Sequence, residues 1–188
     1  MIADIENPFL TIITRTIPER NEKLDRNIAS ANRQTSLNFL HWFLHDPDRL
    51  GVGESYRRIA ELAPLLVSRY VFILDDDDEL IDNDFVRKIL PIAYEYNPAV
   101  IMVKMDHGAP LGVLPDAEHW RYPVPVLGKF GVSSFVVRTD VFKKCAHGFT
   151  PTYDGDFNFL FTVFQATGDI YWLDCIASKT QNGASRGK

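Results

Sequence analysis

The sequence predicts a single α/β domain in which helices sandwich a mostly parallel sheet. Three observations lead to this prediction. Short apolar runs alternate with amphipathic segments over the first half of the chain, the order typical of parallel βαβ units. One run, residues 70–74, contains no charged side chain, as expected for a strand that helices cover on both faces. The length of 188 residues suits one domain with one substantial core.

The elements of the first half follow from the spacing of apolar residues. Four β-branched or apolar runs are predicted to be strands: residues 9–14, 38–44, 70–74 and 99–105. Three segments between them space their apolar residues as a helix does: residues 24–31, 56–62 and 85–93. Pro91 is expected to kink the third helix or to remove one of its hydrogen bonds.

The second half departs from this alternation. Residues 106–129 contain four prolines and predict a long loop, a feature that is usually functional in compact domains. Its Trp120 and Tyr122 have rings that could stack on a ligand, and packing against the domain is an equal alternative for each. Further elements are predicted after the loop: strands at 133–137 and 170–173, and helices at 139–144 and 157–166. The domain is expected to span residues 1–177, followed by a polar, flexible tail at 178–188.

Composition excludes several classes of protein and partner. Twenty Lys plus Arg against 25 Asp plus Glu give a net charge of −5, so nucleic acid is not an expected partner. The two cysteines, Cys145 and Cys175, are too few for a disulfide framework; two reduced thiols are favoured over a single bridge. The N-terminus does not resemble a signal peptide, and no apolar run is long enough for a transmembrane segment. We therefore expect a soluble, cytoplasmic protein.

A run of acidic residues, Asp75 to Asp78 and Glu79, follows the strand at 70–74 directly. Ligands of open parallel sheets bind at the carboxyl ends of the strands, and adjacent carboxylates repel one another unless a positive charge is near. An oxygen-preferring cation, Mg²⁺ or Mn²⁺, suits such a turn. The alternative is a solvated turn at the start of the next helix. Position favours the metal site, because the strand ends at 14–16 and 45–46 are polar as well.

Taken in order, five segments of the chain resemble a known family. They are residues 11–35, residues 51–58 with their glycines and arginines, the strand and D-x-D at 70–80, residues 131–142, and residues 154–160. Together they are similar to the GT-A fold nucleotide-diphospho-sugar glycosyltransferases of the family-two type. The resemblance covers nearly the whole chain and implies a GT-A, Rossmann-like fold. It also implies a metal-dependent, inverting transfer of a hexose or deoxyhexose from a nucleotide sugar, with UDP preferred, to an acceptor hydroxyl.

The resemblance assigns donor-site roles to particular residues. Asp77 is the first choice as ligand of Mn²⁺ or Mg²⁺, and Asp75 is a possible second ligand. Asp78 is expected to support the turn or the sugar. Nucleotide-sugar binding is expected at a set of strand-end and helix residues: Thr14, Arg15, Thr16, Asp46, Arg58, Asp75 and Asp76. For Asp46, which precedes Pro47, the alternative is a purely structural role in a turn. For one of the two arginines, Arg57 or Arg58, the alternative is a position on a solvated helix face.

The general base is expected to be Asp156, with Asp154 as the fallback. The family has a Glu-Asp pair here, whereas this chain reads Gly155-Asp156, and capping of a helix is the alternative role for Asp156. The family's His after the last strand is also missing, so either water or a C-terminal extension would take its place. Two other functions remain open: a sugar nucleotidyltransferase, and a non-catalytic nucleotide-sugar-binding module of a larger polypeptide.

Overall fold

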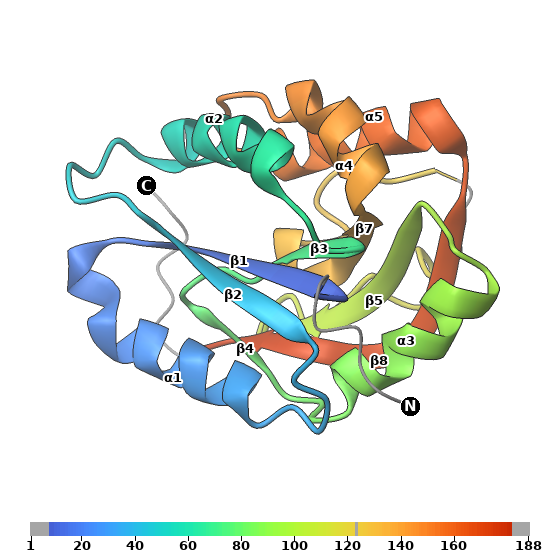
Figure 1. The fold of residues 1–188 in the computed structure, drawn as a ribbon, viewed down its shortest axis with the longest axis horizontal. Helices are drawn as coiled ribbons and strands as arrows, with labels where there is room; N and C mark the ends of the chain where they lie inside the picture. Colours follow the sequence, from blue (N-terminus) through green and yellow to red (C-terminus); the bar gives the residue numbers. More distant parts are fainter. Residues whose placement is uncertain (1–7, 123, 182–188) are drawn as a thin grey trace.

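A computed structural model of the chain describes residues 8–122 and 124–181. Its centre is an eight-stranded sheet with helices on both faces (Figure 1). The strands are β1 (Leu10–Thr16), β2 (Phe39–His45), β3 (Tyr70–Ile73), β4 (Asp78–Leu80), β5 (Val100–Asp106), β6 (Val113–Leu114), β7 (Phe135–Arg138) and β8 (Ile170–Thr180). The α-helices are α1 (Asn21–Asn32), α2 (Val52–Leu62), α3 (Phe85–Glu95), α4 (Thr139–Cys145) and α5 (Gly155–Thr167). Short 3₁₀ turns lie at Pro18–Arg20, Ala63–Leu65, Val132–Ser134 and Ala146–Gly148.

The strand order is β2-β1-β3-β7-β5-β8-β4, and β6 pairs with β5. Strands β2, β1 and β3 are parallel to one another, and β5 is parallel to β8. Between these two groups β7 runs antiparallel to both of its neighbours, so β5 and β8 point the same way as β1. The prediction of a mostly parallel sheet is therefore confirmed. The antiparallel direction of β7, β6 and β4 was not predicted.

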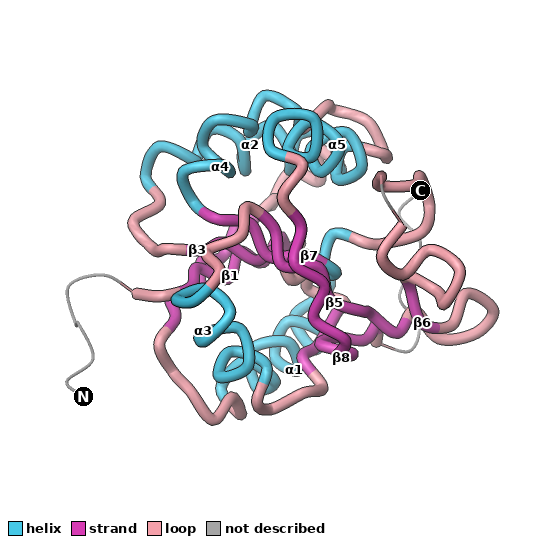
Figure 2. Tube along the Cα trace, turned by 90° about the vertical axis from the view of Figure 1, so that its right-hand side faces the viewer, coloured by secondary structure: helices cyan, strands magenta, loops and turns pink. Residues whose placement is uncertain are grey.

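Helices α2, α4 and α5 cover one face of the sheet, and α1 and α3 cover the other (Figures 1 and 2). Alternate residues of each central strand enter the two cores, because successive side chains of a strand point to opposite faces. In β3, Val71 and Ile73 pack beneath α2 and α4, whereas Tyr70 and Phe72 pack against α3. This double burial explains why residues 70–74 carry no charged side chain.

Two segments differ from the prediction. Strand β4 lies inside the acidic run, where a turn was expected, and pairs Asp78 with Thr180 of β8. Strand β8 is also longer than predicted, since it continues through Ser178–Thr180, which we had assigned to the tail. Ser178 is fully buried, and its hydroxyl donates a hydrogen bond of 2.9 Å to the Ser133 carbonyl. The rest of the expected tail, residues 182–188, lies outside the described residues.

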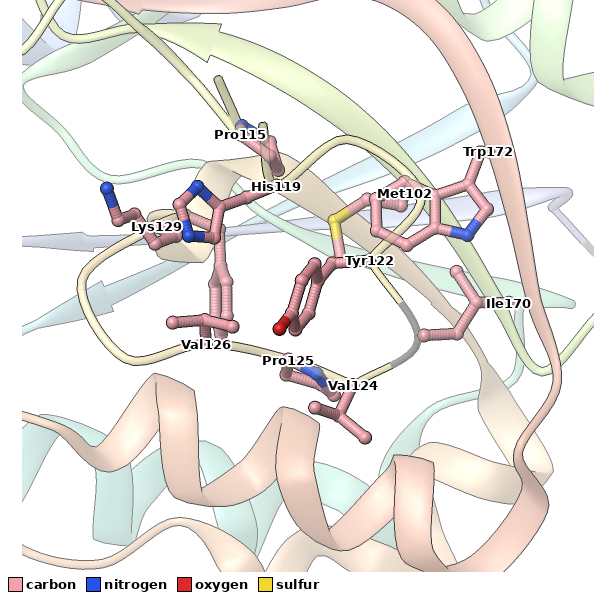
Figure 3. Close-up of a pocket in the computed structure, with 11 residues that line it drawn as sticks. Met102, Pro115, His119, Tyr122, Val124, Pro125, Val126, Lys129, Ile170 and Trp172 are labelled. Carbon is pink, nitrogen blue, oxygen red and sulfur yellow. The ribbon is translucent and has the colours of Figure 1, made fainter. Parts of the chain in front are cut away.

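The long loop packs against the sheet. Trp120 meets Trp172 of β8 edge to face at 5.0 Å, with the Lys104 ammonium 4.5 Å from its ring centre, so packing is the role that the structure gives this ring. Tyr122 lines a small, mostly apolar pocket together with His119, Pro125 and Trp172 (Figure 3). Cys145 and Cys175 are both unpaired, as favoured above. Within residues 8–122 and 124–181, no helix has the length and apolar character needed to cross a membrane.

Candidate functional site

The three polar strand ends lie side by side at one edge of the sheet. Thr16 and His45 are register partners at the ends of β1 and β2. The Asp46 amide donates to the Thr16 carbonyl at 2.9 Å, and the Leu74 amide donates to the Ile13 carbonyl at 3.0 Å. The structure therefore brings together residues 14–16, residues 45–46 and the run from Asp75 to Asp78 at the ends of β1, β2 and β3.

The backbone of this acidic turn is held by hydrogen bonds from two other elements. The Asn27 amide group, on α1, donates to the carbonyls of Asp75 at 2.9 Å and Asp78 at 3.0 Å. Just after β8, the Gln181 backbone N–H donates to the Asp77 carbonyl at 2.7 Å. The turn itself closes with a 2.9 Å bond from the Asp78 amide to the Asp75 carbonyl. With its carbonyls fixed in this way, the turn presents its carboxylates in one arrangement.

Three of these carboxylates converge. Asp75, Asp77 and Asp78 each offer an oxygen, and the three oxygens lie within 4.8 Å of one another. Burial, followed by repulsion from Asp75, raises the pKa of Asp77 to about 6. The same two causes raise the pKa of Asp78 well above its usual range. The Ser133 hydroxyl donates a 2.7 Å hydrogen bond to Asp78, which acts in the opposite direction and lowers this pKa. This oxygen set suits a hard divalent cation, whose charge would relieve the repulsion. Asp78 joins Asp75 and Asp77 here, beyond its expected supporting role.

Two arginines contact the turn. Arg15, at the end of β1, binds Asp75 in bidentate fashion, through Nε to Oδ1 at 2.7 Å and through Nη2 to Oδ2. Arg20, in the 3₁₀ turn before α1, lies 2.7 Å from Asp76 and 3.3 Å from Asp77. Arg15 was predicted to belong to the site, but its pairing with Asp75 was not. Arg20 was not predicted as a site residue.

The first turn of α5 lies against Arg15 through Tyr56. The Arg15 guanidinium carbon is 4.5 Å from the centre of the Tyr56 ring. The Tyr56 ring also packs closely against Gly155. A Cβ at Gly155 would come within 2.5 Å of the ring and 2.6 Å of the Thr150 carbonyl oxygen, so only glycine fits without rearrangement. A Cβ added to Gly53 of α2 would likewise come within 2.6 Å of the Pro151 carbonyl oxygen. These two close approaches hold the start of α5 and the segment before it against α2.

Asp156 follows Gly155 and is partly buried next to this contact. Its Oδ1 accepts a 2.8 Å hydrogen bond from the Phe157 amide. Burial raises the pKa of Asp156 to about 6, while the nearby charges of Arg15 and Asp75 act in opposite directions. The N-cap of α5 is Asp154, which is exposed. The N-cap position, which was the alternative role for Asp156, is therefore occupied by Asp154.

Asp46 and Arg58 lie together at the end of β2. Asp46 Oδ2 accepts a 3.2 Å hydrogen bond from the Gly51 amide, and its Oδ1 lies 3.8 Å from Arg58. Arg58 donates to the His45 carbonyl at 3.0 Å. Arg57 instead pairs with Glu54 and Glu61 on the exposed face of α2. Of the two arginines, Arg58 is therefore the one beside the strand ends.

Thr14 does not take the place that we expected for it. It is fully buried, and its hydroxyl donates to the Leu74 carbonyl at 2.8 Å. The same hydroxyl lies 2.8 Å from His41 Nε2 and 3.3 Å from Asn27 Oδ1. Burial lowers the pKa of His41 to about 4 and keeps its ring neutral. Thr14 thus supports the backbone just before the acidic turn, and its side chain is fully buried and does not present its hydroxyl to a ligand. The Thr16 side chain is nearly buried as well.

Solved structures of other proteins share this architecture. TarS 1–349 of S. aureus in complex with UDP-GlcNAc is similar with a TM-score of 0.70 and 14% identity, over 95% of this chain and 60% of that one. Its complex with UDP gives 0.65 and 15%, over 92% and 60%. A197 from STIV gives 0.56 and 12%, over 88% and 82%. The fold is the GT-A fold. The chain spans 36% to 60% of the TarS chains, and neither a protein-family model nor a curated protein matches its sequence.

Proposed function

We propose that this protein is a metal-dependent, inverting glycosyltransferase. It moves a hexose or deoxyhexose from a nucleotide sugar, UDP-linked by preference, to the hydroxyl of a glycan or other acceptor. The cytoplasm is its proposed location, which the two unpaired cysteines favour.

The observation that supports this proposal best is one cluster at the sheet edge. This cluster contains the acidic turn, with its three converging carboxylate oxygens, and the partly buried Asp156 of α5. Arg15, which contacts the turn, and Tyr56, which contacts Arg15, lie between them. The fold that carries this cluster is shared with TarS, which has been solved with UDP-GlcNAc and with UDP bound.

Each part of the cluster has a role in this reaction. Asp75, Asp77 and Asp78 would hold Mn²⁺ or Mg²⁺, which when bound offsets the negative charge that builds on the leaving nucleoside diphosphate. Asp46 and Arg58 bind the nucleotide, where the Asp46 Oδ1 has no hydrogen-bond partner among the described residues and can accept from a base N–H. Arg15 completes the donor side, and the nearly buried Thr16 and Asp76 belong to it as parts of the strand end and the acidic turn.

Asp156 acts as the general base. An inverting transfer needs one carboxylate that takes the proton of the acceptor hydroxyl as this oxygen attacks the anomeric carbon. With a pKa of about 6, Asp156 is mostly ionised at pH 7 and yet basic enough to accept a proton. Asp154 is exposed at the N-cap and remains the fallback.

The test has two stages. Thermal unfolding is first measured with a panel of nucleotides and nucleotide sugars, with and without Mn²⁺ or Mg²⁺; a ligand at a hundred times its Kd should stabilise the fold by about 2.7 kcal/mol. Donor hydrolysis and transfer are then compared between wild type, Asp156→Asn and the matched control Asp154→Asn. We expect Asp156→Asn to lose about 10²- to 10⁴-fold in rate, and Asp154→Asn to stay near wild type. Absence of any nucleotide-dependent shift would refute the proposal, and binding without turnover would indicate a non-catalytic module.

A further inference from the structure

Arg20 contacts two aspartates that differ in position and in geometry. Its Nη1 lies 2.7 Å from Asp76 Oδ1 and 3.3 Å from Asp77 Oδ2. The Asp76 side chain is 3% exposed and the Asp77 side chain 15% exposed, whereas Arg20 itself is 24% exposed. The guanidinium is therefore anchored on the deeper carboxylate by the shorter contact, and it reaches the shallower one by the longer contact.

The two partners also differ in what else they can bind. Asp77 belongs to the group of three carboxylates whose oxygens converge, and Asp76 does not. A cation held by that group and the Arg20 guanidinium would both draw on Asp77. Since Arg20 keeps Asp76 as its closer partner, it can release Asp77 without leaving the turn.

Asp76 is well suited to hold Arg20 in place. Its Oδ2 is buried and has no hydrogen-bond partner among the described residues, so loss of Arg20 would leave a deeply buried carboxylate still less compensated. Its carbonyl is fixed by the Gln181 side chain at 3.3 Å, which limits movement of the backbone at this position. The anchor on Asp76 is thus rigid, while 24% of the Arg20 side chain remains exposed.

We infer that Arg20 is a movable counter-ion of the acidic turn: it neutralises Asp77 in the free protein and binds the donor's diphosphate when a divalent cation occupies Asp77. Arginine presents five N–H donors in a planar fork, a geometry that fits phosphate oxygens. This inference rests on the proposed function, because it requires a nucleoside diphosphate at the site.

The experiment measures binding, independently of turnover. Mn²⁺ binding to the nucleotide-free protein is followed by electron paramagnetic resonance, and binding of UDP and of uridine in saturating Mn²⁺ is measured by calorimetry. The variants are Arg20→Gln, Arg20→Lys and the control Arg33→Gln. Arg33 lies at the end of α1 with its side chain 52% exposed and 3.8 Å from Glu79, so its replacement removes the same charge without touching Asp76 or Asp77.

Arg20→Gln should bind Mn²⁺ alone about two- to fivefold more tightly, because a competing cation is gone. It should bind UDP about ten- to a hundredfold more weakly, since a charged hydrogen bond to the diphosphate is lost. Uridine, which has no phosphate, should bind as it does to wild type, and Arg20→Lys should bind UDP with intermediate affinity. Arg33→Gln should match wild type throughout.

Three results would overturn this inference. Unchanged UDP affinity in Arg20→Gln would exclude the diphosphate contact, even if Mn²⁺ binding tightened. Unchanged or weaker Mn²⁺ binding would exclude competition for Asp77. An equal effect of Arg33→Gln would reduce the role of Arg20 to overall charge. If wild type binds no nucleotide at all, the proposed function itself fails, which is a different outcome. Arg20→Lys keeps the test valid should Arg20→Gln not fold.

Discussion

Replacing Asp156 by asparagine should make the protein more stable at neutral pH while it abolishes most of the activity. The substitution removes one negative charge and preserves the shape of the side chain. The amide of the new side chain would still offer an oxygen to the Phe157 N–H, which now bonds Asp156 Oδ1 at 2.8 Å. The change in the free energy of unfolding should therefore reflect the charge and little else.

The size of this effect follows from the pKa of Asp156. It rises from an ordinary value of 3.8 to about 6 in the folded protein, chiefly because the carboxylate is buried. Between these values the folded state binds more protons than the unfolded state, so the free energy of unfolding of wild type falls as the pH rises. The difference in pKa corresponds to about 3 kcal/mol, fully lost above about pH 7. The variant, which cannot ionise here, avoids this loss.

The assay is urea or thermal unfolding of both proteins between pH 4 and pH 8 in the presence of a metal chelator. We expect equal stability near pH 4 and an advantage of about 3 kcal/mol for Asp156→Asn at pH 7, or about 6–12 °C in Tm. Asp154→Asn changes an exposed carboxylate two residues away and should show no such trend. Equal stability of Asp156→Asn and wild type across the whole pH range would show that Asp156 is not destabilised by burial and would remove the argument for it as a tuned base.

Three further expectations concern the same site. The kcat/KM of wild type should fall about tenfold between pH 7 and pH 5, because Asp156 accepts a proton only when ionised; a flat profile would point to another base. Gly155→Ala should cost about 1–3 kcal/mol of stability in urea unfolding, since its Cβ would overlap the Tyr56 ring, and a variant as stable as wild type would contradict this packing. Ser133→Ala should weaken Mn²⁺ binding about tenfold in a metal titration, because the hydroxyl orients Asp78; Ser134→Ala, whose hydroxyl accepts from Gly131, is the matched control and should bind normally.

The sequence contained enough to predict the layered fold and the edge of the sheet where the site lies. The unbroken run at 70–74 and the alternation around it report burial on two faces, which is a local property of the chain. Strand directions are not local. Strand β7 pairs antiparallel with both β3 and β5, and nothing in Phe135–Arg138 itself indicates those neighbours or its direction.

The side-chain partners in the site were less predictable for the same reason. Thr14 was expected at the donor because it ends a strand, but the alternation of β1 turns it inward to Leu74 and His41. Counting side-chain alternation forward by two residues from the buried Ile12 would have indicated this. Arg20 lies in a polar turn before a helix, where most arginines are solvated. Its partner Asp76 is 56 residues away in the sequence, so only the tertiary fold brings the two together. Tyr56 was predicted to be an apolar position of a helix, and the structure confirms this. Its contact with the Arg15 guanidinium, which lies over the ring, was not predicted.

The way in which Gln181 and β8 close the acidic turn affects how the protein folds. Asp78 pairs with Thr180, and Gln181 bonds Asp77, so this turn is completed by a segment about a hundred residues further along the chain. Contacts of such separation form late, because the loop entropy must be overcome before they stabilise the structure. The β1-β2-β3 unit can pair before β8 is present, whereas the carboxylates cannot be fixed until it is. Weakening the pairing of β8 with β4 should thus reduce metal binding even where β1, β2 and β3 remain paired.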